Sequence, residues 1–173
     1  MTTQTSTLKS KTLLEEIRKY LPQEKSAQVG EALTYAFQCH KGQKRDSGAP
    51  YIEHPLNTAL LLAEMRLDAT ALCAALLHDV IEDCGVSHEE LSKEFNKGVA
   101  NLVEGVTKLK KLDMISTNSK MVKQYIHPEA SRSASLRKML VAMAEDIRVV
   151  FIKLADRLLI MQTLEDLSPT KRK

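Results

Sequence analysis

The sequence predicts an all-α fold, and three observations support this prediction. Aromatic side chains make up only 4% of the 173 residues and tryptophan is absent, so the core must consist of Leu, Ile, Val, Ala and Met. These residues pack well between helices. Apolar positions recur at helical spacing, and no stretch alternates long enough to predict a sheet. We therefore expect a single helical domain over residues 1–173, with its core over about residues 28–167.

The first half of the chain predicts three helices and one basic loop. Apolar residues at helical spacing over 13–21 predict a first helix that Pro22 closes, and a second covers about 28–40. Two glycines, a proline and three cations then indicate an exposed loop at 41–51. Pro55 suits the first turn of the next helix, because no backbone donor is needed there.

The segment 70–83 is apolar on nearly all sides until its last turn, which predicts one central buried helix. Gly85 ends it, and Ser87 followed by Glu90 has the spacing of a capping box that starts another helix.

Further helices are expected in the second half, over about residues 99–109, 134–144 and 149–164. Between them, residues 113–128 have poor periodicity and several polar side chains, so we expect a long loop or a weakly ordered segment there.

Charge and cysteine usage exclude several classes of protein. A balance of 25 basic and 22 acidic side chains, net +3, favours neither a nucleic-acid nor a membrane surface. No apolar stretch reaches membrane-spanning length, and the N-terminus lacks the pattern of a secretory signal. The three cysteines form no CxxC pair, which is typical of packing residues in a reducing compartment. These features predict a cytoplasmic location.

Candidate metal ligands gather in two places. His54 follows the basic loop, and His78 is followed by Asp79 at the end of an apolar helix. An imidazole beside carboxylates suits a divalent transition metal, although ligand type alone does not separate Mn, Fe and Zn. Because a carboxylate at a buried helix end is costly unless it is paired or metal-bound, Asp79 strengthens this interpretation. The alternative is a helix-terminal charge that faces water.

Two further acidic features accompany these residues. Glu82 and Asp83 lie one helical turn beyond the His-Asp pair, where a carboxylate could orient a metal-bound water or accept its proton. The alternative is an acidic turn that begins a loop. Asp156 lies in a strongly apolar stretch, where it either serves a site or, with Arg157, covers the polar side of an amphipathic helix.

Together these residues match a known family. The segments GQKRDSGAPYIEHP, ALLHDVIEDCGVSHEEL, LVEGVTKL and LRKMLVAMAEDIRVVFIKLADRL occur in order over about residues 36–167. The chain resembles the HD-superfamily hydrolase domain of the RelA/SpoT homologues, the proteins that make and degrade the stringent-response alarmone (p)ppGpp. The resemblance implies an HD-type helical bundle, which would bring ligands from distant helices together.

The resemblance also implies an activity and its residues. The reaction is the Mn²⁺-dependent removal of the 3′-pyrophosphate of ppGpp or pppGpp, by a hydrolase of phosphoric diesters, giving GDP or GTP. The implied metal ligands are His54, His78, Asp79 and Asp156; the catalytic pair is Glu82 and Asp83; and the substrate contacts are Lys44, Arg45, Ser47 and Thr163. His40, His88 and His127 match no ligand position and are expected to be surface or structural residues. The stretch VAMAEDIRVVFIKLADRL looks like that of the multidomain relatives, so we expect the chain to be the N-terminal fragment of a longer bifunctional protein with synthetase and regulatory domains.

The chain departs from the family pattern near the implied nucleotide site. Leu159 and Ile160 stand where the family usually has His and Asn, Gln162 replaces an Arg, and Asp46 stands where a second cation usually follows the Arg. A lost hydrogen-bonding group costs about 1–3 kcal/mol when its partner stays buried. Two alternatives therefore stay open: a regulatory module that binds ppGpp with little or no turnover, and an HD phosphohydrolase of another nucleotide.

Overall fold

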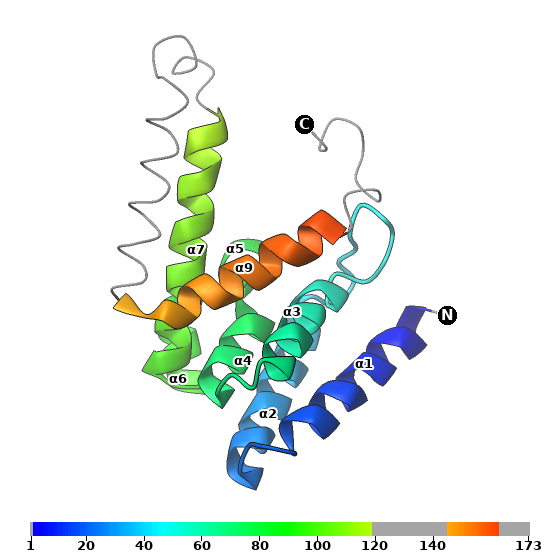
Figure 1. Cartoon of the computed structure of the whole chain (residues 1–173). Helices are drawn as coiled ribbons and strands as arrows, with labels where there is room; N and C mark the ends of the chain where they lie inside the picture. Colours follow the sequence, from blue (N-terminus) through cyan, green and yellow to red (C-terminus); the bar gives the residue numbers. More distant parts are fainter. Residues whose placement is uncertain (1, 119–144, 163–173) are drawn as a thin grey trace.

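The computed structural model describes residues 2–118 and 145–162, and every regular element in these ranges is a helix (Figure 1). This confirms the all-α prediction. The helices are α1 (Thr2–Ile17), α2 (Gln23–Cys39), α3 (Glu53–Glu64), α4 (Ala69–Leu77), α5 (Val80–Asp83), α6 (His88–Glu94), α7 (Lys97–Asn118) and α9 (Ile147–Gln162).

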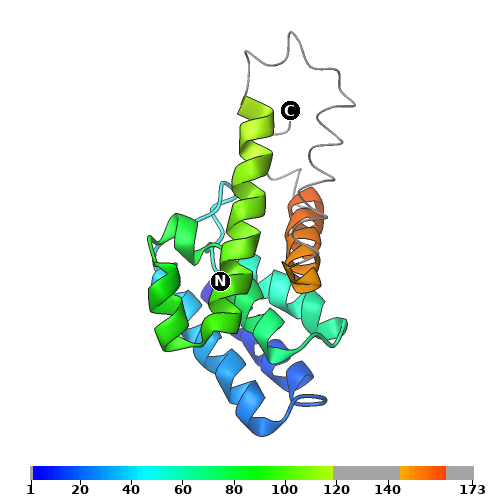
Figure 2. The ribbon, with the colours of Figure 1, turned by 90° about the vertical axis from the view of Figure 1, so that its left-hand side faces the viewer.

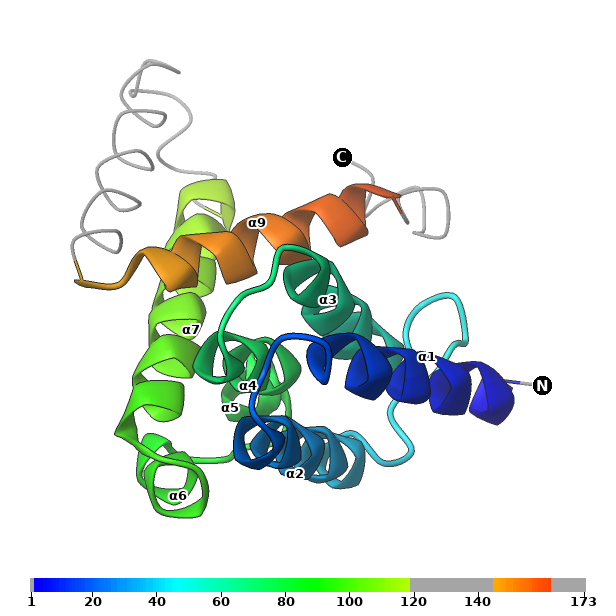
Figure 3. The same ribbon diagram turned by 60° about the horizontal axis from the view of Figure 1, so that its bottom comes forward.

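Helix α4 forms the centre of the bundle. Its sequence ATALCAALL carries no charge, and every residue except Thr70 is buried. Helices α2, α3, α7 and α9 pack around it, and α1 covers α3 from outside (Figure 3). Asp68 caps α4 by accepting a 2.9 Å hydrogen bond from the Ala71 amide. Both ends of this apolar helix are therefore polar, and the functional residues lie at its C-terminal end.

Helix α9 crosses the long helix α7 and packs on α3 (Figures 1 and 2). The crossing is close because Gly105 of α7 faces Val149 of α9: a Cβ on Gly105 would lie 2.9 Å from Val149 Cγ2. The start of α9 is held by Arg148, whose guanidinium pairs with Asp146 and with Asp68, both at 2.6 Å. Glycine at the crossing and arginine at the end thus set the position of α9.

The predicted basic loop is confirmed between α2 and α3. Gly42 and Gly48 both adopt φ = +83°, in the left-handed region that glycine enters at little cost. The Arg45 amide donates to the Ala49 carbonyl at 2.8 Å, and Lys44 pairs with Pro50 in an isolated bridge. These contacts fold the loop back on itself and lead the chain into α3, whose first turn contains Pro55 as expected.

The prediction of one continuous helix over 70–83 is wrong. The chain forms α4 and α5, with His78 and Asp79 in a turn between them. The reason is local: His78 Nδ1 lies 2.7 Å from the Ala75 carbonyl oxygen, the acceptor that the Asp79 amide would use in an uninterrupted helix. Asp83 still follows Asp79 by one helical turn, because its amide donates to the Asp79 carbonyl at 2.8 Å.

The expected loop at 113–128 is also partly wrong, because α7 continues through Asn118. No glycine or proline follows Gly105 within this helix, so nothing in the backbone ends it once the buried part has formed. Three parts of these predictions lie outside the described residues: the rest of the expected loop at 119–128, the helix expected at 134–144, and the last two residues of the helix expected at 149–164. The capping box is confirmed: the Ser87 hydroxyl accepts from the Glu90 amide, and the Glu90 carboxylate accepts from the Ser87 amide at 2.7 Å.

Candidate metal centre and cleft

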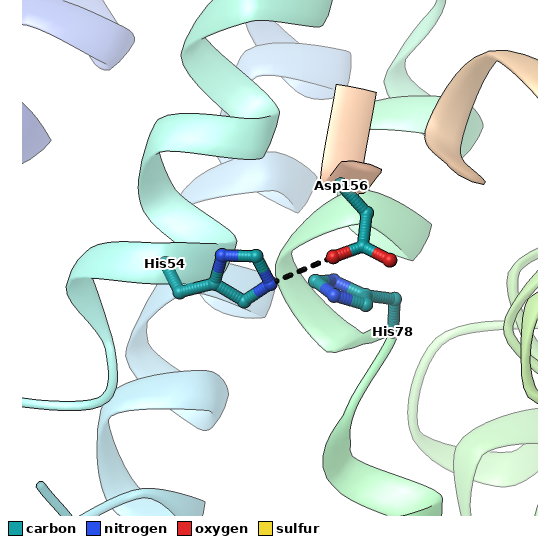
Figure 4. A group of neighbouring side chains, drawn as sticks. All are labelled: His54, His78 and Asp156. Atoms are coloured by element: carbon teal, nitrogen blue, oxygen red, sulfur yellow. Dashed lines mark ion pairs between the residues drawn. The ribbon is translucent and has the colours of Figure 1, made fainter. Parts of the chain in front are cut away.

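Three predicted metal ligands converge from three parts of the fold. His54 comes from the first turn of α3, His78 from the turn after α4 and Asp156 from the middle of α9 (Figure 4). One ligand atom of each lies within 4.8 Å of the others, and all three residues are buried. His54 Nε2 is 3.1 Å from Asp156 Oδ1, along the line that Figure 4 marks. Two imidazoles and a carboxylate form a donor set that suits a divalent transition metal.

His78 supplies the strongest indication of a metal. Its Nδ1 lies 2.7 Å from the Ala75 carbonyl, so this nitrogen carries the proton and Nε2 has a bare lone pair. The side chain is only 1% exposed, so water does not reach Nε2, and yet this atom has no hydrogen-bond partner. A buried polar atom without a partner is uncommon. The side chain is therefore held as a metal ligand would be, with the donor atom directed at His54 and Asp156.

Asp79, the fourth predicted ligand, lies beside this group and has partners of its own. Its Oδ2 is 3.3 Å from His78 Nε2 and accepts a 2.8 Å hydrogen bond from the Tyr51 hydroxyl. Its Oδ1 accepts from Lys110 Nζ at 3.1 Å. Burial by itself would raise the pKa of Asp79, but His78, Lys110 and His54 outweigh it and hold that pKa well below the usual range. The carboxylate is therefore ionised.

Asp156 and His54 are also held in the charge states that a metal requires. Burial would raise the pKa of Asp156, but the neighbouring His54, His78 and Lys153 lower that pKa below the usual range. Lys153 Nζ lies 3.0 Å from Asp156 Oδ2. Burial lowers the pKa of His54, so its ring is neutral near pH 7 and its nitrogen can bind a cation.

The predicted catalytic pair lies next to Asp79 in the single turn of α5, and two residues from elsewhere in the fold contact it. The Tyr51 hydroxyl, between Asp79 and Asp83, is also 2.7 Å from Asp83 Oδ2. Lys110 Nζ lies 2.8 Å from Glu82 Oε2. Burial, and then the neighbouring Asp79 and Asp83, raise the pKa of Tyr51 above its ordinary value, so its hydroxyl keeps its proton. Glu82 and Asp83 are thus fixed on either side of Asp79 despite the break in the helix.

A cleft of about 230 Å³ opens above the ligand group. Four cations line it, namely Arg45, Lys110, Lys153 and Arg157. The other lining residues are Tyr51, His54, Asp79, Asp156 and Ile160. Of the predicted substrate contacts, only Arg45 reaches the cleft. Lys44 and Ser47 are exposed in the loop and do not line it, and Thr163 lies outside the described residues. This charge distribution suits a small, multiply anionic ligand.

The remaining histidines and the cysteines have structural surroundings. His40 is buried, stacks on Tyr51 and lies 2.7 Å from Gln43 Oε1, while the half-buried His88 is 2.9 Å from Asn101 Oδ1. His127 lies outside the described residues. The cysteines are unpaired: Cys73 is buried, and Cys39 and Cys84 are half-buried.

Tyr51, Lys110 and Lys153 were not identified from the sequence as site residues. Lys153 lies three residues before Asp156, and this helical spacing could have indicated their pairing. Tyr51 and Lys110 meet Asp79 only through the packing of the loop and α7, for which no local pattern exists.

Comparison with known proteins agrees with the helical fold. A family model described as an HD domain matches residues 32–173. The chain is 42% identical over 160 residues to the GTP pyrophosphokinase rsh of Brucella melitensis biotype 1, covering 92% of this chain and 20% of that protein. It is 45% identical over 157 residues to the bifunctional (p)ppGpp synthase/hydrolase SpoT of Escherichia coli K12, covering 91% of this chain and 21% of that protein. The chain thus spans about a fifth of the length of these relatives.

The solved structure of a metazoan orthologue of SpoT is similar as well. That orthologue is described as a protein that hydrolyses ppGpp and plays a role in starvation responses. It is 28% identical to this chain with a TM-score of 0.60, and the match covers 88% of this chain and 79% of that one. These similarities confirm the predicted resemblance to the RelA/SpoT homologues. Among the described residues, no helix is long and apolar enough to cross a membrane.

Proposed function

Because this chain belongs to the HD domain family and two histidines and an aspartate converge in its cleft, we propose that it hydrolyses (p)ppGpp with the help of Mn²⁺. The products are pyrophosphate and GDP or GTP. The observation that carries the proposal is the buried Nε2 of His78, which has no hydrogen-bond partner and faces the other ligands. Relatives named as (p)ppGpp hydrolases support the choice of substrate.

In this proposal His54, His78, Asp79 and Asp156 hold the ion. A bound divalent metal supplies a polarised phosphate oxygen and a water of lowered pKa. Glu82 and Asp83 orient that water and accept its proton. Tyr51 keeps Asp83 and Asp79 in place through its hydroxyl, which contacts both carboxylates.

The cations at the edge of the cleft bind the phosphates. Arg45 and Arg157 line the cleft outside the ligand group, where they can pair with the negative charges of the substrate. Negative charge grows on the leaving pyrophosphate as the P–O bond breaks, and fixed cations stabilise such charge. Lys44 and Ser47 lie in the adjoining loop and are proposed as secondary contacts, and Thr163 is proposed from the resemblance alone.

The synthetase and regulatory domains of the longer relatives belong to this proposal as well. The chain would then be the hydrolase module of a bifunctional protein, and its cytoplasmic location would follow from its nucleotide substrate. The share of the relatives that the chain spans, about a fifth, supports this part of the proposal.

The test measures pyrophosphate release from ppGpp by the metal-depleted chain before and after Mn²⁺ is added. Activity should require Mn²⁺ and disappear in Asp79→Ala. The matched control is His88→Ala, which removes a half-buried histidine bonded to Asn101 outside the cleft and should leave the rate unchanged. A metal-loaded chain that binds ppGpp but never releases pyrophosphate would refute the hydrolase.

One observation favours a second candidate, a regulatory module that binds ppGpp with little turnover. Ile160 lines the cleft, so an apolar side chain stands at the position where the family pattern described above implies an Asn. Calorimetry with ppGpp separates the two, because normal affinity with rapid hydrolysis excludes the module. The double variant Leu159→His, Ile160→Asn should raise the rate if the lost polar groups limit it. GDP, dGTP and NADPH in the same assay test whether another nucleotide is preferred.

A further inference from the structure

The two oxygens of the Asp79 carboxylate face different neighbours. Oδ2 lies on the side of the ligand group, 3.3 Å from His78 Nε2 and 3.9 Å from His54 Nε2. Oδ1 lies on the other side and accepts from Lys110 Nζ at 3.1 Å. The same ammonium is 2.8 Å from Glu82 Oε2. Asp79 therefore presents one oxygen to the ligand group, where the proposed metal would lie, and the other to an ammonium.

We propose that the Lys110 ammonium is the second cation of a two-cation centre and supplies the positive charge that a second metal ion supplies in two-metal phosphohydrolases. This inference rests on the proposed function for the first cation, the metal held by His54, His78 and Asp156. Paired metals about 3.5–4 Å apart stabilise both the attacking and the leaving oxygen of a phosphoryl transfer. Here one of the two positive charges is covalently part of the chain.

Burial and charge balance support this assignment. The side chains of Asp79 and Glu82 are 3% and 14% exposed, and Asp83 is the third carboxylate of the cluster. So many carboxylates in a partly dry site repel one another unless cations lie between them. Lys110 lies between two of them, with its Nζ 3.1 Å from Asp79 Oδ1 and 2.8 Å from Glu82 Oε2.

The position of Lys110 also gives it access to the substrate. Its side chain is 31% exposed and lines the cleft together with Arg45 and Arg157. An ammonium has three donors. One of them serves Asp79 in a hydrogen bond, and the charge also pairs with Glu82 Oε2 at 2.8 Å. Another donor can bind a phosphate oxygen of a ligand in the cleft. Lys110 would thus both position Glu82 and stabilise charge on the phosphate.

The test counts bound Mn²⁺ per chain by calorimetry and by metal analysis, with no nucleotide present. The wild-type chain should bind one ion. Lys110→Asp should bind two, because Asp79, Glu82 and the new carboxylate then offer hard oxygen ligands without a competing ammonium. Lys110→Arg keeps the charge and should bind one. The matched control is Lys108→Asp, the same change on the same helix at a side chain that is 63% exposed and pairs with Glu104; it should also bind one.

Two ions in the wild-type chain, or one ion in a folded Lys110→Asp chain, would overturn the inference. Helix content from circular dichroism shows whether that variant folds. If it does not, Lys110→Gln takes its place: it removes the charge at similar length, and a second, weaker Mn²⁺ is expected between Asp79 and Glu82, so its absence would also overturn the inference. A wild-type chain that binds no Mn²⁺ would overturn the proposed function as well, whereas two ions would overturn this inference alone.

Discussion

Replacing Gly105 by alanine tests the close crossing of α7 and α9. A Cβ at this position would lie 2.9 Å from Val149 Cγ2 and 3.4 Å from Cγ1, closer than carbon atoms normally pack. Val149 is buried and β-branched, so it has little freedom to turn aside. Either the valine or the whole of α9 must move, and α9 carries Asp156 seven residues further on.

Two opposing effects decide how much Gly105→Ala changes the free energy of unfolding. Alanine favours a helix interior over glycine by about 1 kcal/mol, whereas overpacking a core costs about 1–3 kcal/mol. The expected net effect of Gly105→Ala is a loss of up to about 2 kcal/mol in the free energy of unfolding. Gly30 provides a matched control in the middle of α2, because its Cβ would meet only Leu14 Cδ2, at 3.8 Å. Gly30→Ala should therefore stabilise the fold by about 0.5–1 kcal/mol.

The assay is urea unfolding followed by circular dichroism for the wild-type chain and both variants. For a chain of this size each kcal/mol corresponds to about 2–4 °C in melting temperature, so a thermal scan checks the sign independently. Mn²⁺ affinity should fall in Gly105→Ala and stay unchanged in Gly30→Ala, because only the first change moves α9. Equal stabilisation by the two substitutions would refute the close crossing and the reasoning that follows from it.

Two further predictions concern titrating groups. Burial raises the pKa of Cys84 to about 11 and that of Cys73 to about 12. The rate of alkylation by iodoacetamide should therefore be low near neutral pH and rise about tenfold per pH unit as the thiolates form. Rapid labelling of either cysteine at neutral pH, detected by mass spectrometry, would contradict this prediction. Hydrogen bonds from Arg148 lower the pKa of Asp146, so this carboxylate stabilises the fold above its unfolded pKa of about 3.9, and the contribution is lost as the pH falls through the folded value. Asp146→Asn should therefore cost up to about 1 kcal/mol near neutral pH, with a difference from wild type that shrinks in acid unfolding experiments; a difference independent of pH would refute the assignment.

Local signals predicted the parts of the fold that depend on neighbouring residues. The capping box at Ser87 and Glu90, the glycine-containing loop and the proline in the first turn of α3 each follow from short-range chemistry, and the structure confirms them. The break at His78 was missed because it depends on a side chain taking a backbone acceptor, which apolar periodicity does not show. The extension of α7 was missed because polar residues continue a helix that its buried part has already nucleated.

The residues of the site also fall into those that the sequence predicted and those that it did not. The resemblance to a known family supplied His54, His78 and Asp156 as ligands, and the structure brings their donor atoms together from distant helices. Lys110 and Tyr51 were not identified, because their contacts with Asp79 exist only after α7 and the loop have packed. Lys44 and Ser47 show the opposite case: a basic loop was predicted correctly, but of its three cations only Arg45 lines the cleft.

The pair of His54 and Asp156 also affects how the bundle opens. These residues lie about a hundred residues apart in the sequence, on α3 and α9, and the proposed ion would be bound by both. A ligand that binds only the closed arrangement adds its binding free energy to the stability of that arrangement. Detachment of α9 from the bundle and dissociation of the ion would then be one event. The rate at which bound Mn²⁺ exchanges with solvent would accordingly report how often this helix lifts, and hydrogen exchange of α9 amides should slow when Mn²⁺ is added.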